Sequence, residues 1–189
     1  MLAKSMQVGF PAELSKDVYQ VVKHIPIDNN ISNSVTELRF RYTLNGGLVE
    51  IPYRIYLSDT ATMKLNDQQR TIAHCLFSRS GDGYVRQKHI EALLTVDYPD
   101  WAIPYIVKAC DEYVVEILEA VYAKISLLNN ERLKRFWQEN AKLFHISYQR
   151  MISYWNEFYR DRCSRFHQYI GRKLFIECFG YSRKFEKIK

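Results

Sequence analysis

Hydrophobic and polar positions follow two different periods along the chain. Between residues 37 and 57 they alternate on both sides of Asn45-Gly46-Gly47, residue types suited to the positive φ angles of tight hairpin turns. This pattern predicts a β-hairpin, in which Pro52 favours an edge position for its strand. Apolar residues at helical spacing predict a short helix over 11–24, and residues 25–34 have the composition of a loop.

From residue 63 onward the apolar residues recur every three or four positions. This spacing occupies residues 65–80, 84–96 and 101–125, with short breaks between them that contain Gly or Pro. The pattern predicts amphipathic helices joined by short turns.

The last third of the chain carries the longest stripe. Its apolar residues alternate in steps of four and three, and a shift by one residue after Phe158 continues them. The first part is Trp137, Ala141, Phe144, Tyr148, Met151, Trp155 and Phe158, and the second is Tyr159, Cys163, Phe166 and Ile170. No Pro or Gly interrupts residues 131–170, so the stripe predicts one long helix or two helices with a bend near the shift. Such regular spacing favours burial, within the chain or in a homodimer through this helix.

These elements predict a mostly α fold, with α+β character at the N-terminus. Its parts are an N-terminal helix plus β-hairpin over residues 1–62, helix hairpins over 63–128, and basic aromatic C-terminal helices over 129–189. We expect them to form one compact domain, because 189 residues suffice for one sizeable core.

Two motifs in the middle segment are spaced 29 residues apart. Asp82-Gly83-Tyr84-Val85-Arg86 is followed by Ala92-Leu93, and Asp111-Glu112-Tyr113-Val114 repeats its beginning. Residues 65–126 thereby resemble a HEAT-type helical repeat. The segment departs from that family at His89, where a small residue is usual, and at Val115, where an arginine is expected. The resemblance implies stacked helix pairs with a shared apolar face and a ridged surface for partners.

Composition and charge narrow the class of protein. With 47% hydrophobic and 25% charged residues, the chain is typical of a soluble globular protein. The net charge of +6 belongs to residues 131–189, which hold 14 basic and 6 acidic side chains, against 13 and 15 in residues 1–130. The N-terminal residues do not form the apolar stretch of a signal peptide, and the four cysteines are widely spaced. We therefore expect a cytoplasmic protein with reduced thiols and no membrane partner.

Basic residues that lie off the aromatic stripe are the candidate surface for RNA, DNA or another partner. They are Arg150, Arg160, Arg162, Arg165, Arg172 and Lys173. The acidic residues Asp111, Glu112, Glu116 and Glu119 form an opposite face, either solvated or packed against Arg and Lys of the C-terminal helix.

Arg160 and Arg162 also precede His167 at spacings of seven and five residues. This arrangement is similar to the Arg-x4–6-His motif of HEPN-type ribonucleases. The resemblance implies that an arginine engages the scissile phosphate while His167 assists proton transfer. On an uninterrupted helix, Arg160 and His167 would share one face.

Sequence motifs for other catalytic chemistry are missing. The chain has no phosphate-binding Gly-rich loop, GxSxG or HExxH, and Cys163, His167 and Cys178 do not make a known zinc pattern. His74 and Cys75 are adjacent and point in different directions on a helix, which argues against a nucleophile and base pair. We expect no cofactor and no metal.

The preferred functional prediction is a non-catalytic macromolecule-binding protein, an adaptor, scaffold or inhibitor/immunity-type partner that binds another protein by shape. The alternatives are nucleic-acid binding through the basic C-terminal face and a HEPN-like ribonuclease.

Overall fold

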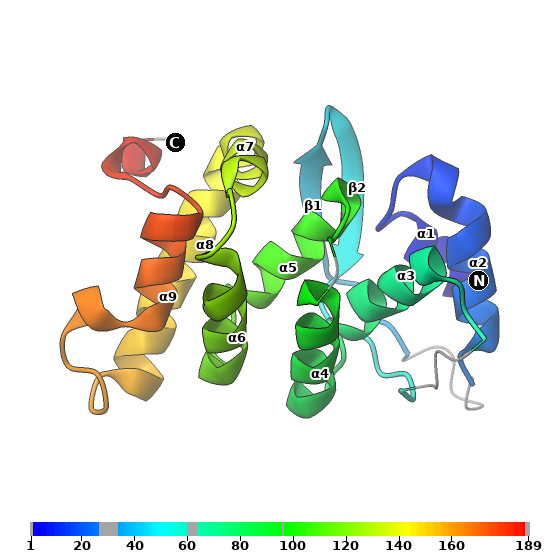
Figure 1. The fold of residues 1–189 in the computed structure, drawn as a ribbon, viewed down its shortest axis with the longest axis horizontal. Helices are drawn as coiled ribbons and strands as arrows, with labels where there is room; N and C mark the ends of the chain where they lie inside the picture. The colour runs from blue at the N-terminus through cyan, green and yellow to red at the C-terminus, as the bar shows by residue number, and fades with distance from the viewer. Residues whose placement is uncertain (1, 27–33, 60–63, 96, 188–189) are drawn as a thin grey trace. The chain divides into compact units, whose positions relative to one another are not determined.

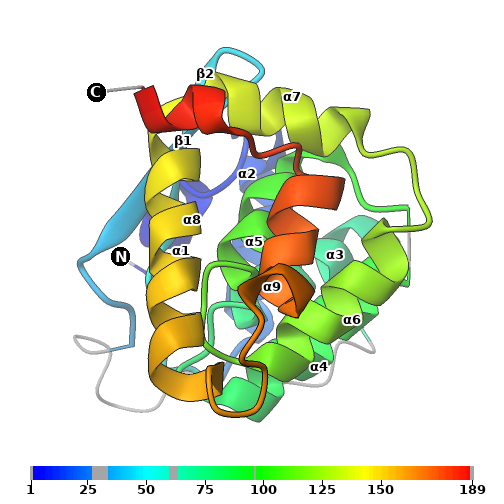
Figure 2. The ribbon, with the colours of Figure 1, turned by 90° about the vertical axis from the view of Figure 1, so that its left-hand side faces the viewer.

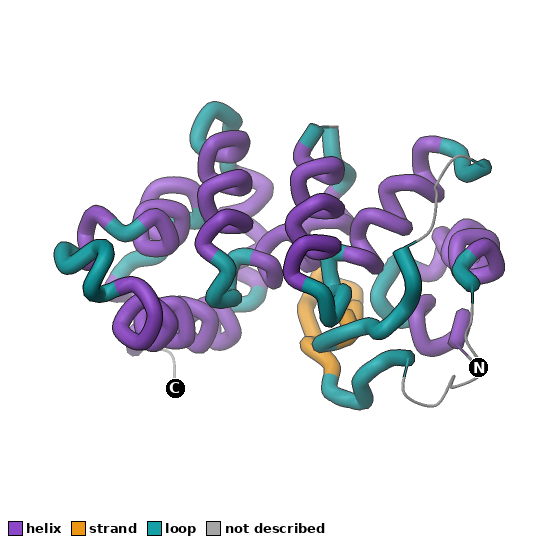
Figure 3. Tube along the Cα trace, turned by 90° about the horizontal axis from the view of Figure 1, so that it is seen from below, coloured by secondary structure: helices purple, strands orange, loops and turns teal. Residues whose placement is uncertain are grey.

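The computed structural model describes residues 2–26, 34–59, 64–95 and 97–187. The chain divides into two compact units, residues 1–106 and 107–189, and the boundary falls inside helix α5 (Ile103–Ala109). Both strands, orange in Figure 3, belong to the first unit, and the described part of the second unit consists of helices and loops. The prediction of a mostly α fold with a small N-terminal β-hairpin is confirmed.

The first unit combines the hairpin with short helices (Figure 1). Its elements are α1 (Leu2–Gln7), α2 (Ser15–His24), β1 (Arg39–Leu44), β2 (Gly47–Pro52), α3 (Asp67–Phe77) and α4 (Gly83–Leu94), with 3-10 turns at Ala12–Leu14 and Asp100–Ala102. Helix α2 packs against α1 and α3, and α3 packs against α4. A capping box begins α3: the Asn66 side chain accepts from the Gln69 amide at 2.8 Å and the Gln69 side chain accepts from the Asn66 amide.

Strands β1 and β2 pair antiparallel, with Tyr42 opposite Val49. The turn between them has φ angles of 50° at Asn45 and 78° at Gly46, which confirms the prediction from these two residue types. Residues 27–33, within the segment predicted as a loop, lie outside the described residues. Beyond β2, the backbone of Ile55 bonds to the turn between α3 and α4, so the hairpin is tied to that helix pair.

The Asp82–Arg86 motif holds this turn in place. The Asp82 carboxylate accepts from the Tyr84 amide at 2.8 Å and caps α4. The buried Arg86 guanidinium donates to the carbonyl oxygens of Ser80 and Gly81 at 2.9 and 3.1 Å. These bonds give Asp82 and Arg86 a structural role in the turn between α3 and α4. The resemblance to HEAT repeats stays a prediction.

The second unit consists of four helices and the turns that join them (Figure 2). Its helices are α6 (Val115–Ile125), α7 (Glu131–Glu139), α8 (Ala141–Tyr154) and α9 (Ile170–Lys173), with π-helical turns at Trp155–Tyr159 and Leu174–Cys178 and 3-10 turns at Phe166–Gln168 and Arg183–Lys187. Helix α9 lies between α6 and α8 and packs against both.

The helix predicted over residues 131–170 is divided at Asn140 and ends at Tyr159, so that prediction is wrong beyond Tyr159. The buried Asn140 side chain donates to the Phe136 carbonyl at 2.8 Å and terminates α7 without Gly or Pro. The one-residue shift in the stripe falls at the π-helical turn, which accommodates an extra residue. Residues 163–165 are not helical.

The aromatic stripe is core within the chain from Trp137 to Met151, whereas Trp155 and the residues after the shift are half-buried. The Trp137 ring is fully buried and stacks on Phe144 with centroids 4.4 Å apart. Phe175 and Phe179 complete the cluster around it. The prediction of a buried stripe is confirmed for Trp137, Phe144, Tyr148 and Met151, whereas Phe158 at its end is exposed. These core rings are therefore not free to form a dimer interface.

Candidate binding surface and histidine cleft

The loop after the π-helical turn presents three of the six residues of the predicted basic surface. Arg160, Arg162, Arg165 and His167 are all exposed in this loop of residues 160–168. Arg160 donates to the Asn156 side chain at 3.1 Å. Arg172 and Lys173, on α9, are half-buried, and the Arg172 guanidinium lies over the Phe166 ring.

Arg150 lies instead in an ion-pair network. Its Nη1 donates to Asp111 Oδ2 at 2.7 Å, and the Ser147 hydroxyl donates to the same oxygen at 2.7 Å. The other oxygen of the buried Asp111 pairs with the buried Lys108. A buried carboxylate requires such partners, and the network fixes α8 to the segment before α6. The alternative in which the acidic face packs against C-terminal basic residues is confirmed for Asp111.

The geometry expected for a HEPN-like site is not formed by one helix. Arg160 and Arg162 lie in a turn, and His167 lies in the separate 3-10 turn. The prediction that Arg160 and His167 share one helical face is therefore wrong, because the helix ends before them. Within the part of the chain that the structure describes, no hydrogen bond or ion pair joins His167 to either arginine.

An exposed cluster of three rings lies close to the basic loop. Tyr113 contacts Tyr154 and Phe158 with centroid distances of 6.0 and 5.7 Å, and Tyr154 lies 6.2 Å from Phe158. Tyr113 is 47% exposed and Phe158 is 53% exposed. We call these three residues the ring cluster. The sequence patterns had placed Tyr113 in the HEAT-like motif and Phe158 in the core. The break in the stripe just after Phe158 was the feature of the sequence that could have indicated its exposure.

A cleft of about 460 Å³ adjoins the ring cluster. It is lined by Val115, Glu119, Tyr159, Arg162, Cys163, Gln168, Tyr169 and Ile170. The Tyr159 hydroxyl donates to the Tyr113 carbonyl, which ties the wall of the cleft to the cluster. Tyr169 stacks on Tyr159 with centroids 5.7 Å apart, and burial raises the pKa of its hydroxyl.

A second candidate site lies in the first unit, where Asp59, His89 and His74 form a hydrogen-bonded array. Asp59 Oδ1 lies 3.0 Å from His89 Nε2, and His89 Nδ1 lies 2.9 Å from His74 Nδ1. Asp59 Oδ2 also accepts from Lys88 Nζ at 2.5 Å. The buried His89 ring stacks on Phe77 with centroids 5.0 Å apart, which fixes its orientation.

Burial keeps the two histidines of this array neutral. It lowers the pKa of His74 from 6.5 to about 4, with a further contribution from the nearby His89. Burial also lowers the pKa of His89, although Asp59 opposes that effect. For Asp59, burial acts to raise the pKa, but hydrogen bonds from Lys88 and His89 outweigh it and lower the pKa below 3.8. At neutral pH the array therefore consists of one carboxylate and two uncharged imidazoles.

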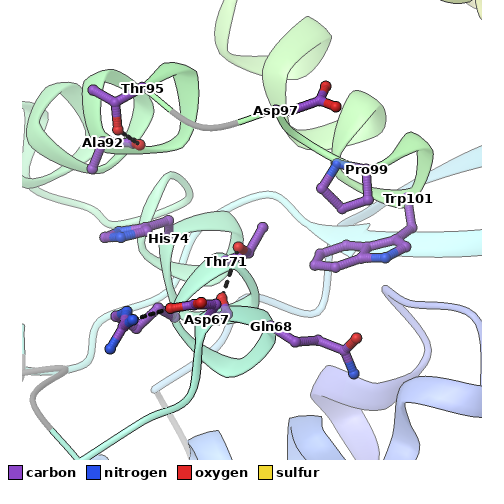
Figure 4. Close-up of a pocket in the computed structure, with 10 residues that line it drawn as sticks. Asp67, Gln68, Thr71, His74, Ala92, Thr95, Asp97, Pro99 and Trp101 are labelled. Carbon is purple, nitrogen blue, oxygen red and sulfur yellow. Dashed lines mark hydrogen bonds and ion pairs between the residues drawn. The ribbon is translucent and has the colours of Figure 1, made fainter.

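His74 lines an open cleft of about 520 Å³ (Figure 4). Helix α3 contributes Asp67, Gln68, Arg70, Thr71 and His74, and the end of α4 with the following segment contributes Ala92, Thr95, Asp97, Pro99 and Trp101. Figure 4 shows Ala92 and Thr95 facing α3 from one side and the Trp101 indole on the other. We call this site the histidine cleft.

Sequence reasoning did not bring these residues together, because they come from three separate segments. The one feature of the sequence that could have indicated this site is the histidine at position 89, where the HEAT family has a small residue.

Within the described ranges, no three His, Cys, Asp or Glu side chains are grouped as metal ligands. None of the described helices is both long and apolar enough to span a bilayer. No family model, curated protein sequence or solved structure matches the chain.

Proposed function

We propose that this chain is a non-catalytic macromolecule-binding protein whose ring cluster contacts another protein. The observation that carries the proposal is the contact between two half-exposed rings, Tyr113 and Phe158, on the surface of the second unit. Arg160 and Arg162 follow the cluster in the chain and are exposed. Tyrosine, phenylalanine and arginine are enriched at protein interfaces, and a few such anchors supply most of the binding energy.

The surroundings of the cluster also support this role. The cleft beside it offers a recess for a side chain of the partner. The loop of residues 160–168 follows one π-helical turn, and α9 after it runs into a second; the π-helical turn is a rare element that is frequent at functional sites. A partner would therefore meet the ring cluster, the adjoining cleft and two exposed arginines of the loop.

Nucleic-acid binding is less well supported by the same residues. The three rings pack on one another, with interplanar angles of 36° to 69°, so their faces are partly covered and less available for base stacking. Arg150 is held in an ion pair with Asp111, and the exposed carboxylates of Glu157 and Asp161 lie near the loop arginines in the sequence, which lowers the net positive charge of this segment. Three phosphate contacts to a single strand would weaken by about 20-fold between 50 and 200 mM salt.

Site-specific photo-crosslinking in cells tests the proposal. A benzophenone amino acid at position 158 should crosslink one partner protein. The control is the same amino acid at position 127, where Leu127 is 83% exposed on the same unit, and it should not crosslink that partner. The partner is then purified, and its affinity is measured by calorimetry. Phe158→Ala or Tyr113→Ala should raise Kd by about 30-fold or more, and Leu127→Ala should leave it within about twofold. Wild-type affinity in both ring variants would refute the proposal.

Fluorescence anisotropy with single-stranded RNA distinguishes the alternatives. Submicromolar binding at physiological salt, lost in the triple variant Arg160→Ala, Arg162→Ala, Arg165→Ala, would favour nucleic-acid binding instead. Cleavage of that RNA, abolished by His167→Ala with binding retained, would favour the ribonuclease.

A further inference from the structure

The hydrogen bonds of the histidine array fix the proton positions on both rings. The Asp59 carboxylate has no hydrogen to donate, so His89 must donate from Nε2. A neutral His89 then has a bare Nδ1, which accepts from the Nδ1–H of His74. His74 Nε2 is consequently bare, with no hydrogen-bond partner among the described residues. Asp59 thus fixes the tautomers of His89 and His74, and as a result His74 Nε2 is a hydrogen-bond acceptor.

The histidine cleft as a whole favours a ligand that donates hydrogen bonds. The carboxylates of Asp67 and Asp97 accept, as does the amide oxygen of Gln68. The strongest donor in the lining, Arg70, already donates to the Leu65 carbonyl at 2.8 Å and to Asp67.

Beside these polar groups, the Trp101 indole and Pro99 supply an apolar wall (Figure 4). The volume of about 520 Å³ falls within the range of about 300–1,000 Å³ for small-molecule sites. A lining with an apolar wall and several acceptors suits a ligand that has one C–H face and several hydroxyl groups.

We propose that the histidine cleft binds a neutral polyhydroxylated ligand of the saccharide or polyol class, with a ligand hydroxyl donating to His74 Nε2 and the sugar face against Trp101. His89 and Asp59 are positioning residues, because they act only through His74. This site belongs to the first unit and does not depend on the protein partner proposed for the second.

Asp59→Asn provides a sharp test of this relay. Lys88 Nζ donates to Asp59 Oδ2, so the carbonyl oxygen of the substituted amide would face Lys88 and its N–H would face His89 Nε2. His89 would then have to donate from Nδ1, and His74 would accept at Nδ1 and carry its proton on Nε2. The substitution should change His74 Nε2 from a hydrogen-bond acceptor to a donor, although Asp59 does not itself line the cleft.

The first measurement is the tautomer of His74 by ¹⁵N NMR, at neutral pH, of full-length protein labelled at histidine and tryptophan. We expect an Nδ1–H tautomer in the wild type and an Nε2–H tautomer in Asp59→Asn. Asp161→Asn, which removes an exposed carboxylate in the second unit, is the matched control and should leave His74 unchanged. An Nε2–H tautomer in the wild type, or an unchanged tautomer in Asp59→Asn, would overturn the relay and the proposal with it.

The second measurement is ligand binding to the same samples. The probes are methyl α-glucoside, methyl β-galactoside, N-acetylglucosamine, ribose and myo-inositol, with tetramethylammonium as a cation control. At least one polyol should saturably shift both the His74 Nε2 and the Trp101 indole resonances, and Asp59→Asn should weaken it about tenfold or more. The proposal is wrong if no polyol shifts both resonances, if only the cation does, or if Asp59→Asn binds as tightly as Asp161→Asn.

Discussion

Replacement of His74 should flatten the dependence of the first unit's stability on pH. His74→Gln removes the titrating ring but keeps a side-chain N–H that can donate to His89. The pKa of His74 is about 4 in the folded chain against 6.5 for an ordinary histidine, chiefly because burial disfavours the charged ring. The unfolded chain therefore takes up the proton first as the pH falls.

The sign and size of the effect follow from this difference. The contribution of His74 to stability is fully present above pH 6.5 and is lost as the pH falls toward 4. A difference of about 2.5 pKa units corresponds to about 3 kcal/mol, and partial exposure of the ring reduces this to about 2 kcal/mol. His89 acts in the same direction, whereas the loss of the Asp59 carboxylate adds destabilisation only at lower pH, since its pKa is lowered below 3.8.

Urea denaturation at pH 7.5, 6.5, 5.5 and 4.5, followed by a probe in the first unit, gives the free energy of unfolding at each pH. We expect wild-type stability to fall by about 2 kcal/mol more than that of His74→Gln across this range. His24→Gln, which removes an exposed histidine of the same unit, should retain the wild-type slope. Parallel curves for wild type and His74→Gln would refute the reasoning, because His74 would then titrate alike in the folded and unfolded chains.

Three further variants test the packing. Trp137→Ala should destabilise the second unit by about 3–5 kcal/mol in guanidinium denaturation, because it empties a fully buried site stacked on Phe144; a loss below about 1 kcal/mol would contradict core packing. Asp111→Ala should cost about 3–5 kcal/mol in urea denaturation, because it leaves the buried Lys108 without the carboxylate that it shares with Arg150; a stability equal to that of the wild type would show that the network contributes nothing. Gly46→Ala should cost about 1–2 kcal/mol in thermal denaturation, because its φ is 78°; a neutral effect would mean that the turn relaxes.

Local patterns predicted much of the fold. The hairpin follows from Asn45-Gly46 and from the alternation around it, since few residue types tolerate φ angles of 50° and 78°. The burial of Trp137 and Phe144 follows from their heptad spacing. These predictions succeed because each depends on neighbouring residues alone.

Local patterns did not predict where the helices end within residues 131–170. Asn140 ends α7 by bonding to Phe136, and nothing in a helical stripe without Pro or Gly signals that break. The chain then leaves the helix after Tyr159, so Arg160 and His167 are not held on one face. Helix termini depend on competition between local hydrogen bonds and tertiary packing, and the stripe reports only the packing.

The amino-acid sequence by itself determined the class of elements, the hairpin turn, the aromatic core and the concentration of positive charge in the C-terminal third. Only the tertiary structure decided which side chains meet: Asp111 pairs with Arg150 across 39 positions, and Asp59 pairs with His89 across 30. Hydrogen bonds act over about 3 Å, whereas residues so distant in sequence approach each other only through the packing of whole helices. For this reason the spacing of residues in the sequence could not predict the histidine cleft or the ring cluster, although the sequence contains every residue that forms them.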